Sequence, residues 1–316
     1  MKILVLNAGS SSLKFGVFDL ARTDSRVFKG EFERFEGGKA VLHYRVGGEV
    51  GQELKREESV PSLTAAVARV PALLEEFNCA DIHAIGHRVV HGGERFRSTA
   101  LIDEEMLVAI DQCSNLAPMH NPVALLTIRS SQEQWPSLPQ AAVFDTAFHQ
   151  SMPEHVYTYA IPQAWRQLGL RRYGFHGTSH HYVAMRAAEA LERPLQELRL
   201  LSCHLGNGAS VCAISHGKSL DTSMGMTPLE GLVMGTRSGD VDPGLFAFLQ
   251  RELGLDAAAI EQQLQNASGL LALCGNADMR SVEQHAAAGD KSAQLALKVY
   301  AYRVRKYLGA YAAAMG

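Results

Sequence analysis

The chain begins with two short apolar runs separated by a stretch of small polar residues. Residues 2–6 and 15–18 have the apolar, β-branched or aromatic content of buried strands. The eight residues between Leu6 and Phe15 include three consecutive serines. We predict a hairpin whose tip exposes main-chain N–H groups and hydroxyls, with Lys14 adding a positive charge. Such a tip suits phosphate oxygens, and an ordinary polar turn is the alternative.

Alternating and helical patterns continue through the first half of the chain. Residues 40–46 partly alternate and run into Gly47-Gly48, which predicts a strand and a hairpin turn. Apolar residues recur on one face of 62–77, the spacing of an amphipathic helix. The same reasoning predicts helices at 104–112 and 123–133, and buried strands at 83–90 and 141–144.

The pattern then starts again, which indicates a duplicated architecture. Residues 157–161 predict a strand, 179–192 a helix, and 199–204 and 209–215 two strands joined by Gly206-Asn207-Gly208. This second hairpin with a small-residue tip resembles the opening one. Helical patterns dominate from Pro243, and the last helix covers 288–315. We therefore predict an α/β fold with domains 1–150 and 151–316 and a cleft between them.

Composition excludes several classes of protein. The chain has 316 residues, is 47% hydrophobic and carries a net charge of −3, so no basic excess indicates nucleic acid or a membrane surface as a partner. Five widely spaced cysteines without a C-x-x-C pair fit free thiols in a reducing compartment. The apolar N-terminal run is too short for a signal peptide, and no stretch is long enough to span a bilayer. We expect a cytoplasmic protein.

Polar residues gather at the ends of the predicted strands of the first half. Arg88 precedes Gly92-Gly93, and a guanidinium there can clamp a carboxylate or a phosphate, or simply form a surface ion pair. Asp145 directly follows a strand, a position that commonly faces the ligand in α/β folds, although a helix N-cap is the alternative. His120 is bracketed by prolines and is either a fixed functional side chain or a packing residue.

The second half carries a histidine cluster and a long glycine-rich loop. His176 and His180 have the spacing of metal ligands, but no H-E-x-x-H glutamate accompanies them. A histidine at a helix start better suits the stabilisation of developing negative charge. Arg237 lies in the irregular segment 221–244, and loops of that length inside a compact domain are usually functional.

Taken together, these stretches resemble the acetate kinase (acetokinase) family of the actin-like superfamily of sugar kinases. The matching motifs occupy residues 7–14, 87–93, 118–122, 144–149, 172–180, 204–210 and 221–244, in the family's order. The resemblance implies two actin-like (ribonuclease H-like) βββαβαβα domains with an interdomain cleft. It also implies reversible, direct in-line transfer of the ATP γ-phosphoryl to acetate, giving acetyl phosphate and ADP, with Mg²⁺ or Mn²⁺ and as a homodimer.

The resemblance implies roles for single residues in the reaction. Arg88 and Arg237 would bind the acetate carboxylate and the phosphoryl group, and His176 would stabilise the phosphoryl group during transfer. Asp145 would orient the reactants or the metal, and Asn7 would contact the metal. These roles agree with the needs of phosphoryl transfer, which depends on positioning and on positive groups around the charged oxygens.

Further residues are implied to bind the nucleotide and the substrate. The phosphate and nucleotide set is Ser10, Ser12, Lys14, His204, Leu205, Gly206, Asn207, Gly208, Asp278, Met279 and Arg280, and His120 and His180 would have supporting roles. The methyl pocket would consist of Val90, Met119, Phe175 and Pro228. The family usually has leucine where this chain has Met119. A flexible methionine would make the pocket less strict, so a propionate kinase is the alternative.

Family members are longer than this chain. The resemblance implies a later adenosine-binding loop and a metal-binding glutamate, and neither occurs before Gly316. We therefore expect the chain to bind ATP poorly, as a truncated and catalytically impaired form would. Two other classes are a nucleotide-switched binding protein of the same superfamily and a histidine-rich metal hydrolase. Arg88, His176 and Arg237 argue against the switch, which has no need of an acetate site.

Overall fold

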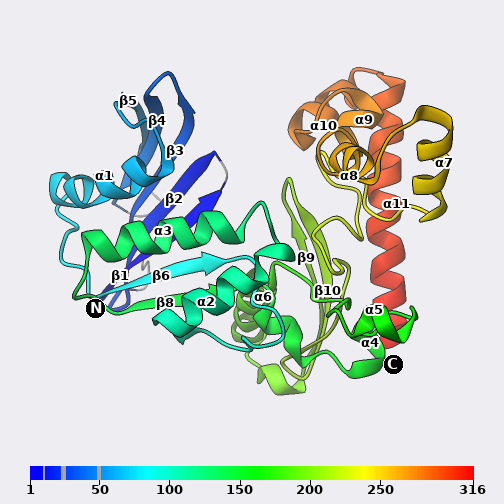
Figure 1. Cartoon of the computed structure of the whole chain (residues 1–316), viewed down its shortest axis with the longest axis horizontal. Coiled ribbons are helices and arrows are strands. Elements are labelled where there is room, and N and C mark those ends of the chain that lie inside the picture. Colours follow the sequence, from blue (N-terminus) through cyan, green and yellow to red (C-terminus); the bar gives the residue numbers. More distant parts are fainter. Residues whose placement is uncertain (10, 23–25, 48–50) are drawn as a thin grey trace. The chain divides into compact units, whose positions relative to one another are not determined.

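A computed structural model describes residues 1–9, 11–22, 26–47 and 51–316. The chain divides into two compact units, Met1–Ala147 (unit 1) and Phe148–Gly316 (unit 2). Both units combine a sheet with helices (Figure 1). The boundary between the units falls close to residue 150, where the sequence pattern starts again.

Unit 1 is built on an eight-stranded sheet with the order β5-β4-β3-β2-β1-β6-β8-β7. The strands are β1 (Lys2–Gly9), β2 (Ser12–Asp19), β3 (Arg26–Glu36), β4 (Lys39–Val46), β5 (Glu53–Glu58), β6 (Ala84–Val89), β7 (Ala100–Leu101) and β8 (Gln140–Phe144). The first five form an antiparallel meander, whereas β6 and β8 run parallel to β1. The predicted opening hairpin is confirmed, with Asn7 opposite Lys14. Gly48 of the predicted second turn lies outside the described residues.

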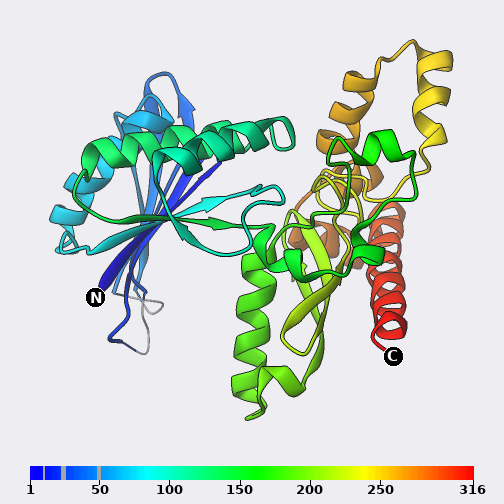
Figure 2. The same cartoon turned by 60° about the horizontal axis from the view of Figure 1, so that its bottom comes forward.

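Helices α1 (Leu63–Glu76) and α3 (Asn121–Gln134) pack side by side on the unit 1 sheet, and α2 (Glu104–Gln112) packs against α3 (Figure 2). All three predicted helices are confirmed. Leu4, Leu6, Phe15 and Phe28 from the strands form one core with the apolar face of α1. Gly30 is required in β3, because a Cβ there would lie 2.3 Å from the Phe15 ring. A 3-10 turn, Cys113–Asn115, follows α2.

Unit 2 contains a three-stranded antiparallel sheet with the order β11-β10-β9. Its strands are β9 (Arg199–Leu205), β10 (Ala209–Ser215) and β11 (Lys218–Thr222), which confirms the predicted hairpin around Asn207. The helix α6 (Gly177–Ala190) contacts β9, and α11 (Lys291–Ala314) contacts β9 and β10. The sheet therefore lies between these two helices (Figures 1 and 2). This places the histidines of α6 next to the serines of β9 and β10.

The remaining elements of unit 2 are mostly short helices. They are the 3-10 helices Ala147–Ser151 (which begins in unit 1) and Leu195–Glu197, and the α-helices α4 (Glu154–Tyr157), α5 (Gln163–Arg166), α7 (Gly244–Leu253), α8 (Ala257–Asn266), α9 (Gly269–Cys274) and α10 (Met279–Ala287). The helical pattern predicted beyond Pro243 is confirmed. Across the described ranges, no helix has both the length and the apolar character needed to cross a membrane.

The strand predicted at 157–161 is wrong. Tyr157 ends α4, and residues 158–161 are irregular, with bends at 160 and 161 and no strand partner among the described residues. Their polar atoms bond to loops instead: Tyr159 Oη donates to Glu230 (2.6 Å) and accepts from the Met226 N–H (3.0 Å). The hydroxyl of Tyr159 therefore anchors the 221–244 loop.

Candidate active site

Three predicted site residues of unit 1 come together beyond the carboxyl ends of parallel strands. Val89 of β6 lies opposite Phe144 of β8, which brings Arg88 beside Asp145. The Arg88 guanidinium donates from Nη2 to Asp145 Oδ2 (2.6 Å) and from Nε to Oδ1 (3.0 Å). Its Nη1 donates to Asn7 Oδ1 on β1 (3.2 Å). Two side chains from neighbouring strands thus fix the direction of one guanidinium.

Burial differs sharply within this group. The Asp145 side chain is 3% exposed, whereas the Arg88 side chain is 39% exposed. Burial lowers the pKa of Arg88 but the Asp145 carboxylate raises it more, and the net shift is upward. The guanidinium therefore stays charged and can still meet an anion from solvent. A planar, anchored guanidinium is well suited to a carboxylate or a phosphoryl group.

Lys14, which was predicted to bind phosphate, pairs with a neighbouring strand. Its ammonium group forms an ion pair with Glu31 of β3 (3.1 Å) and its side chain is 55% exposed. Exposed ion pairs contribute about 0–1 kcal/mol, so a phosphate could replace Glu31 at little cost. Ser12 opens β2, and Ser10 lies outside the described residues.

The loop that follows β6 is held by the side chains of Asn121 and Thr146, to which the sequence assigned no function. Asn121 accepts from the His91 N–H (3.1 Å) and donates to the His91 carbonyl (2.9 Å). Thr146 Oγ1 accepts from the Gly92 N–H (3.1 Å). Both are fully buried. Because Asn121 begins α3, these bonds connect the loop that contains Val90 to the start of that helix.

The predicted substrate and supporting residues of unit 1 lie near that junction. His120 is the N-cap residue of α3. Met119 precedes it and is 66% exposed, while Val90 is half-buried. The exposed thioether of Met119 is free of close packing and can adapt to substrates of different size.

In unit 2, the predicted histidines form a hydrogen-bonded cluster with serines. His176 Nδ1 bonds to Ser210 Oγ (2.9 Å), and the same hydroxyl bonds to His180 Nε2 (2.8 Å). His180 Nδ1 bonds in turn to Ser202 Oγ (3.0 Å). The His204 ring stacks on His176 with 4.0 Å between the ring centroids. His176 is the N-cap residue of α6 with φ 60°, so its backbone is in the left-handed region, which is strained for a residue with a side chain.

Arg237 and the tip of the β9–β10 hairpin adjoin this cluster. A Cβ at Gly208 would lie 3.5 Å from both Arg237 Nη1 and His176 Nε2. Burial lowers the pKa of Arg237, and among the described residues no carboxylate forms an ion pair with it. Its Nη1 donates long bonds to the Pro228 carbonyl (3.4 Å) and to Met234 Sδ (4.0 Å). A half-buried cation without a carboxylate partner is suited to binding an anionic ligand.

Phe175, which was predicted to line the methyl pocket, is 1% exposed. Its carbonyl bonds to His149 Nε2 (3.0 Å), which fixes the backbone just before His176. In unit 2 it is a packing residue beside the histidine cluster.

A cavity of about 870 Å³ in unit 2 is lined by most of the residues that were predicted to bind the nucleotide. Its lining includes Leu205, Gly206, Asn207, Asp278, Met279 and Arg280, together with Leu297, Tyr300 and Ala301 of α11. The α11 residues were not predicted, because a helix face carries no motif. Asp278 caps α10 and pairs with Arg280, whose guanidinium lowers the pKa of the carboxyl to about 2. The volume is in the range of small-molecule sites.

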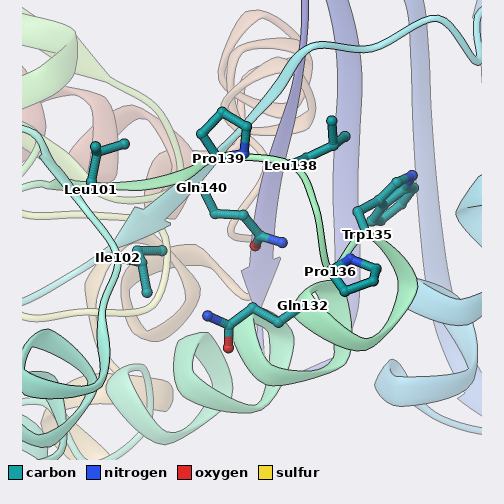
Figure 3. A pocket seen from close by; sticks show the side chains of 8 residues that line it. All are labelled: Leu101, Ile102, Gln132, Trp135, Pro136, Leu138, Pro139 and Gln140. Carbon is teal, nitrogen blue, oxygen red and sulfur yellow. The ribbon is translucent and has the colours of Figure 1, made fainter.

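A second cavity, of about 390 Å³, lies in unit 1 at the start of β8 and contains none of the predicted site residues (Figure 3). Leu101, Ile102, Trp135 and Gln140 are among its lining residues. Asp145 follows the opposite end of the same strand, so this cavity is separate from the Arg88 group.

Metal ligands are few. Among the described residues, no group of three or more histidine, cysteine, aspartate or glutamate side chains is placed to hold a metal ion. Asn7 Oδ1, the predicted contact, already accepts from Arg88.

The sheets, their hairpins and the helices around them define an α/β protein with the actin-like fold. The sequence profile of the acetokinase family matches residues 2–316. The chain belongs to this family.

Several relatives match the whole chain. It is 49% identical to an acetate kinase of Carboxydothermus hydrogenoformans over all of this chain and 80% of the relative. Among solved structures, Porphyromonas gingivalis acetate kinase matches all of this chain and 80% of its own (44% identity, TM-score 0.92). A propionate kinase from Francisella tularensis matches 98% of this chain and 79% of its own (43% identity, TM-score 0.92). The chain thus spans about four fifths of these relatives.

Proposed function

We propose that the protein is an acetate kinase, which transfers the γ-phosphoryl of ATP reversibly to acetate and forms acetyl phosphate and ADP. The observation that carries the proposal is the Arg88 guanidinium, charged, partly exposed and anchored by Asp145 and Asn7. Such a group can hold a carboxylate in one orientation for in-line attack.

In unit 2, Arg237 and His176 would stabilise the phosphoryl group during its transfer. No carboxylate of the described residues forms an ion pair with Arg237, and His176 Nε2 lies near its guanidinium. In phosphoryl transfer, charge accumulates on the equatorial oxygens, and positive groups or hydrogen-bond donors around them lower the barrier. The hairpin tip around Asn207 and the residues of the 870 Å³ cavity would hold the nucleotide.

Mg²⁺ or Mn²⁺ bound with ATP would neutralise phosphate charge, and Asn7 would be the protein contact that the family resemblance implies. We further propose that the protein acts in the cytoplasm, which suits its five unpaired cysteines, and that it forms a homodimer. Sedimentation or light scattering would measure the assembly state.

Propionate is the second candidate substrate. The exposed Met119 and the similarity to a propionate kinase favour it. One methylene discriminates by only about 10–200-fold, so we expect activity on both acids with a higher kcat/KM for acetate. A higher kcat/KM for propionate would reverse the assignment.

The test is trapping of acetyl phosphate with hydroxylamine in the presence of ATP, acetate and magnesium. We expect Arg88→Ala and Arg237→Ala each to lose about 10³-fold or more in rate, because each removes a charge that stabilises the transition state. Arg95→Ala is the matched control, since Arg95 forms an exposed ion pair with Glu105 in the same unit. Near-normal turnover of the Arg88 variant, or no acyl phosphate from the wild type even at saturating ATP, would contradict the proposal.

A further inference from the structure

Four buried or half-buried side chains form one continuous hydrogen-bonded chain that ends at His176. It runs from Ser202 through His180 and Ser210 to His176, with bonds of 3.0, 2.8 and 2.9 Å. Ser210 and His180 are fully buried and Ser202 is 5% exposed. Of these, the sequence interpretation included His180 and His176 but neither serine. The role of the two serine hydroxyls toward His176 is therefore still to be assigned.

His180 is neutral at physiological pH. Burial, together with the neighbouring His149 and His204, lowers its pKa to about 3. A neutral imidazole has one N–H donor and one acceptor nitrogen. Both nitrogens of His180 bond to serine hydroxyls, so one hydroxyl must donate to the ring and the other must accept from it.

The hydroxyl of Ser210 has a single proton to share between two imidazoles. If it donates to His176 Nδ1, that nitrogen is an acceptor and a neutral His176 carries its proton on Nε2. His180 Nε2 then donates to Ser210, and Ser202 donates to His180 Nδ1. In the reverse arrangement His176 carries its proton on Nδ1, and a neutral ring has no donor at Nε2.

The surroundings of His176 Nε2 indicate which of the two tautomers suits phosphoryl transfer. Nε2 and the Arg237 guanidinium both adjoin Gly208, since a Cβ there would be 3.5 Å from His176 Nε2 and from Arg237 Nη1. A proton on Nε2 would supply a donor beside a cation, as a transferring phosphoryl group requires. A lone pair at that place would repel the same oxygens.

We propose that Ser210, supported by His180 and Ser202, is a positioning residue that donates to His176 Nδ1 and so keeps the His176 proton on Nε2. The proposal deepens the proposed function, on which its catalytic meaning rests. Removing the hydroxyl takes away the donor to Nδ1, which raises the population of the Nδ1–H tautomer and reduces the fraction of enzyme with a donor at Nε2.

The experiment compares Ser210→Ala with Ser219→Ala. Ser219 makes the same kind of buried bond, to His149 Nδ1 (2.8 Å), on the neighbouring strand β11. Nitrogen NMR of isotope-labelled histidines reports the tautomer directly in the resting protein. We expect the Nε2–H form of His176 in the wild type and in Ser219→Ala, and a mixture of tautomers in Ser210→Ala.

Kinetics supply the second readout. We expect Ser210→Ala to lower kcat about tenfold, the effect of one hydrogen bond, with little change in KM for acetate. Ser210→Thr, which keeps the hydroxyl, should restore the tautomer and most of kcat. In a His176→Ala background the Ser210 change should have no further effect, because the two act as a unit.

A purely structural role for Ser210 predicts a different result. The His176 tautomer would be unchanged in Ser210→Ala, or the losses with and without His176 would add, and either outcome overturns the proposal. If the wild type forms no acyl phosphate, the proposed function fails, but the tautomer measurement still decides the role of Ser210.

Discussion

At the scale of single residues, the carboxylate of Asp145 fixes the position of the Arg88 guanidinium. Three hydrogen bonds of 2.6–3.1 Å join the two side chains, and Asp145 is 3% exposed. The sequence alone placed each at the end of a strand but not beside the other. They are 57 residues apart, and only the parallel pairing of β6 with β8 brings them together. Ser210 was missed for the same reason, since its partners come from another element.

Asp145→Asn should therefore act through Arg88. The amide has one acceptor oxygen and no charge, so the guanidinium loses its fixed direction. A displacement of about 1 Å at a positioning group can cost about 10²-fold, and we expect a loss of that order in kcat/KM for acetate. Glu105→Gln, which weakens the exposed pair with Arg95, is the control and should change nothing. Equal activity of both variants would show that Arg88 needs no anchor.

At the scale of elements, local patterns predicted the long helices and seven of the eleven strands of the described residues, because apolar spacing is set by burial on one face. Residues 157–161 were wrongly predicted as a strand: the hydroxyl of Tyr159 bonds to a distant loop, so an apolar pattern arose without a strand. Helix α11 shows a second limit. Tyr307 donates to Asp240 (2.8 Å), three residues after Arg237, and Tyr300 lines the nucleotide cavity. Helix α11 thus contributes one tyrosine near Arg237 and one to the nucleotide cavity, and neither tyrosine belongs to a recognisable sequence motif.

The cavity makes Tyr300 a test of the nucleotide assignment. Tyr300 lines it, whereas Tyr302 on the same helix is 63% exposed and does not. Truncating a side chain that contacts the nucleotide removes apolar contact worth about 1–2 kcal/mol, or roughly 5–30-fold in Kd. We expect Tyr300→Ala to weaken ADP binding by that factor in calorimetry and Tyr302→Ala to leave it unchanged. Equal affinities would place the nucleotide elsewhere.

At the scale of the whole molecule, buried neutral histidines make the fold sensitive to acid. Burial lowers the pKa of His87 and of His91 to about 4 and, with neighbouring histidines, that of His180 to about 3. The ordinary value is 6.5. Below pH 6.5 the unfolded chain therefore binds protons that the folded chain does not. These groups contribute stability that is complete above pH 6.5 and is lost as the pH falls towards 4.

Each such histidine lowers the free energy of unfolding by up to about 1.4 kcal/mol per pH unit inside this window. Carboxylates titrate mainly below it, so the interval from pH 6.5 to 5 isolates the histidines. We expect denaturant unfolding to show a steep fall in the free energy of unfolding over this interval. His87→Gln should reduce the slope of that free energy against pH by the contribution of about one proton. His285→Gln, at an exposed position on α10, should not change it. An unaltered slope in the His87 variant would mean that this ring is hydrated and titrates normally in the folded protein.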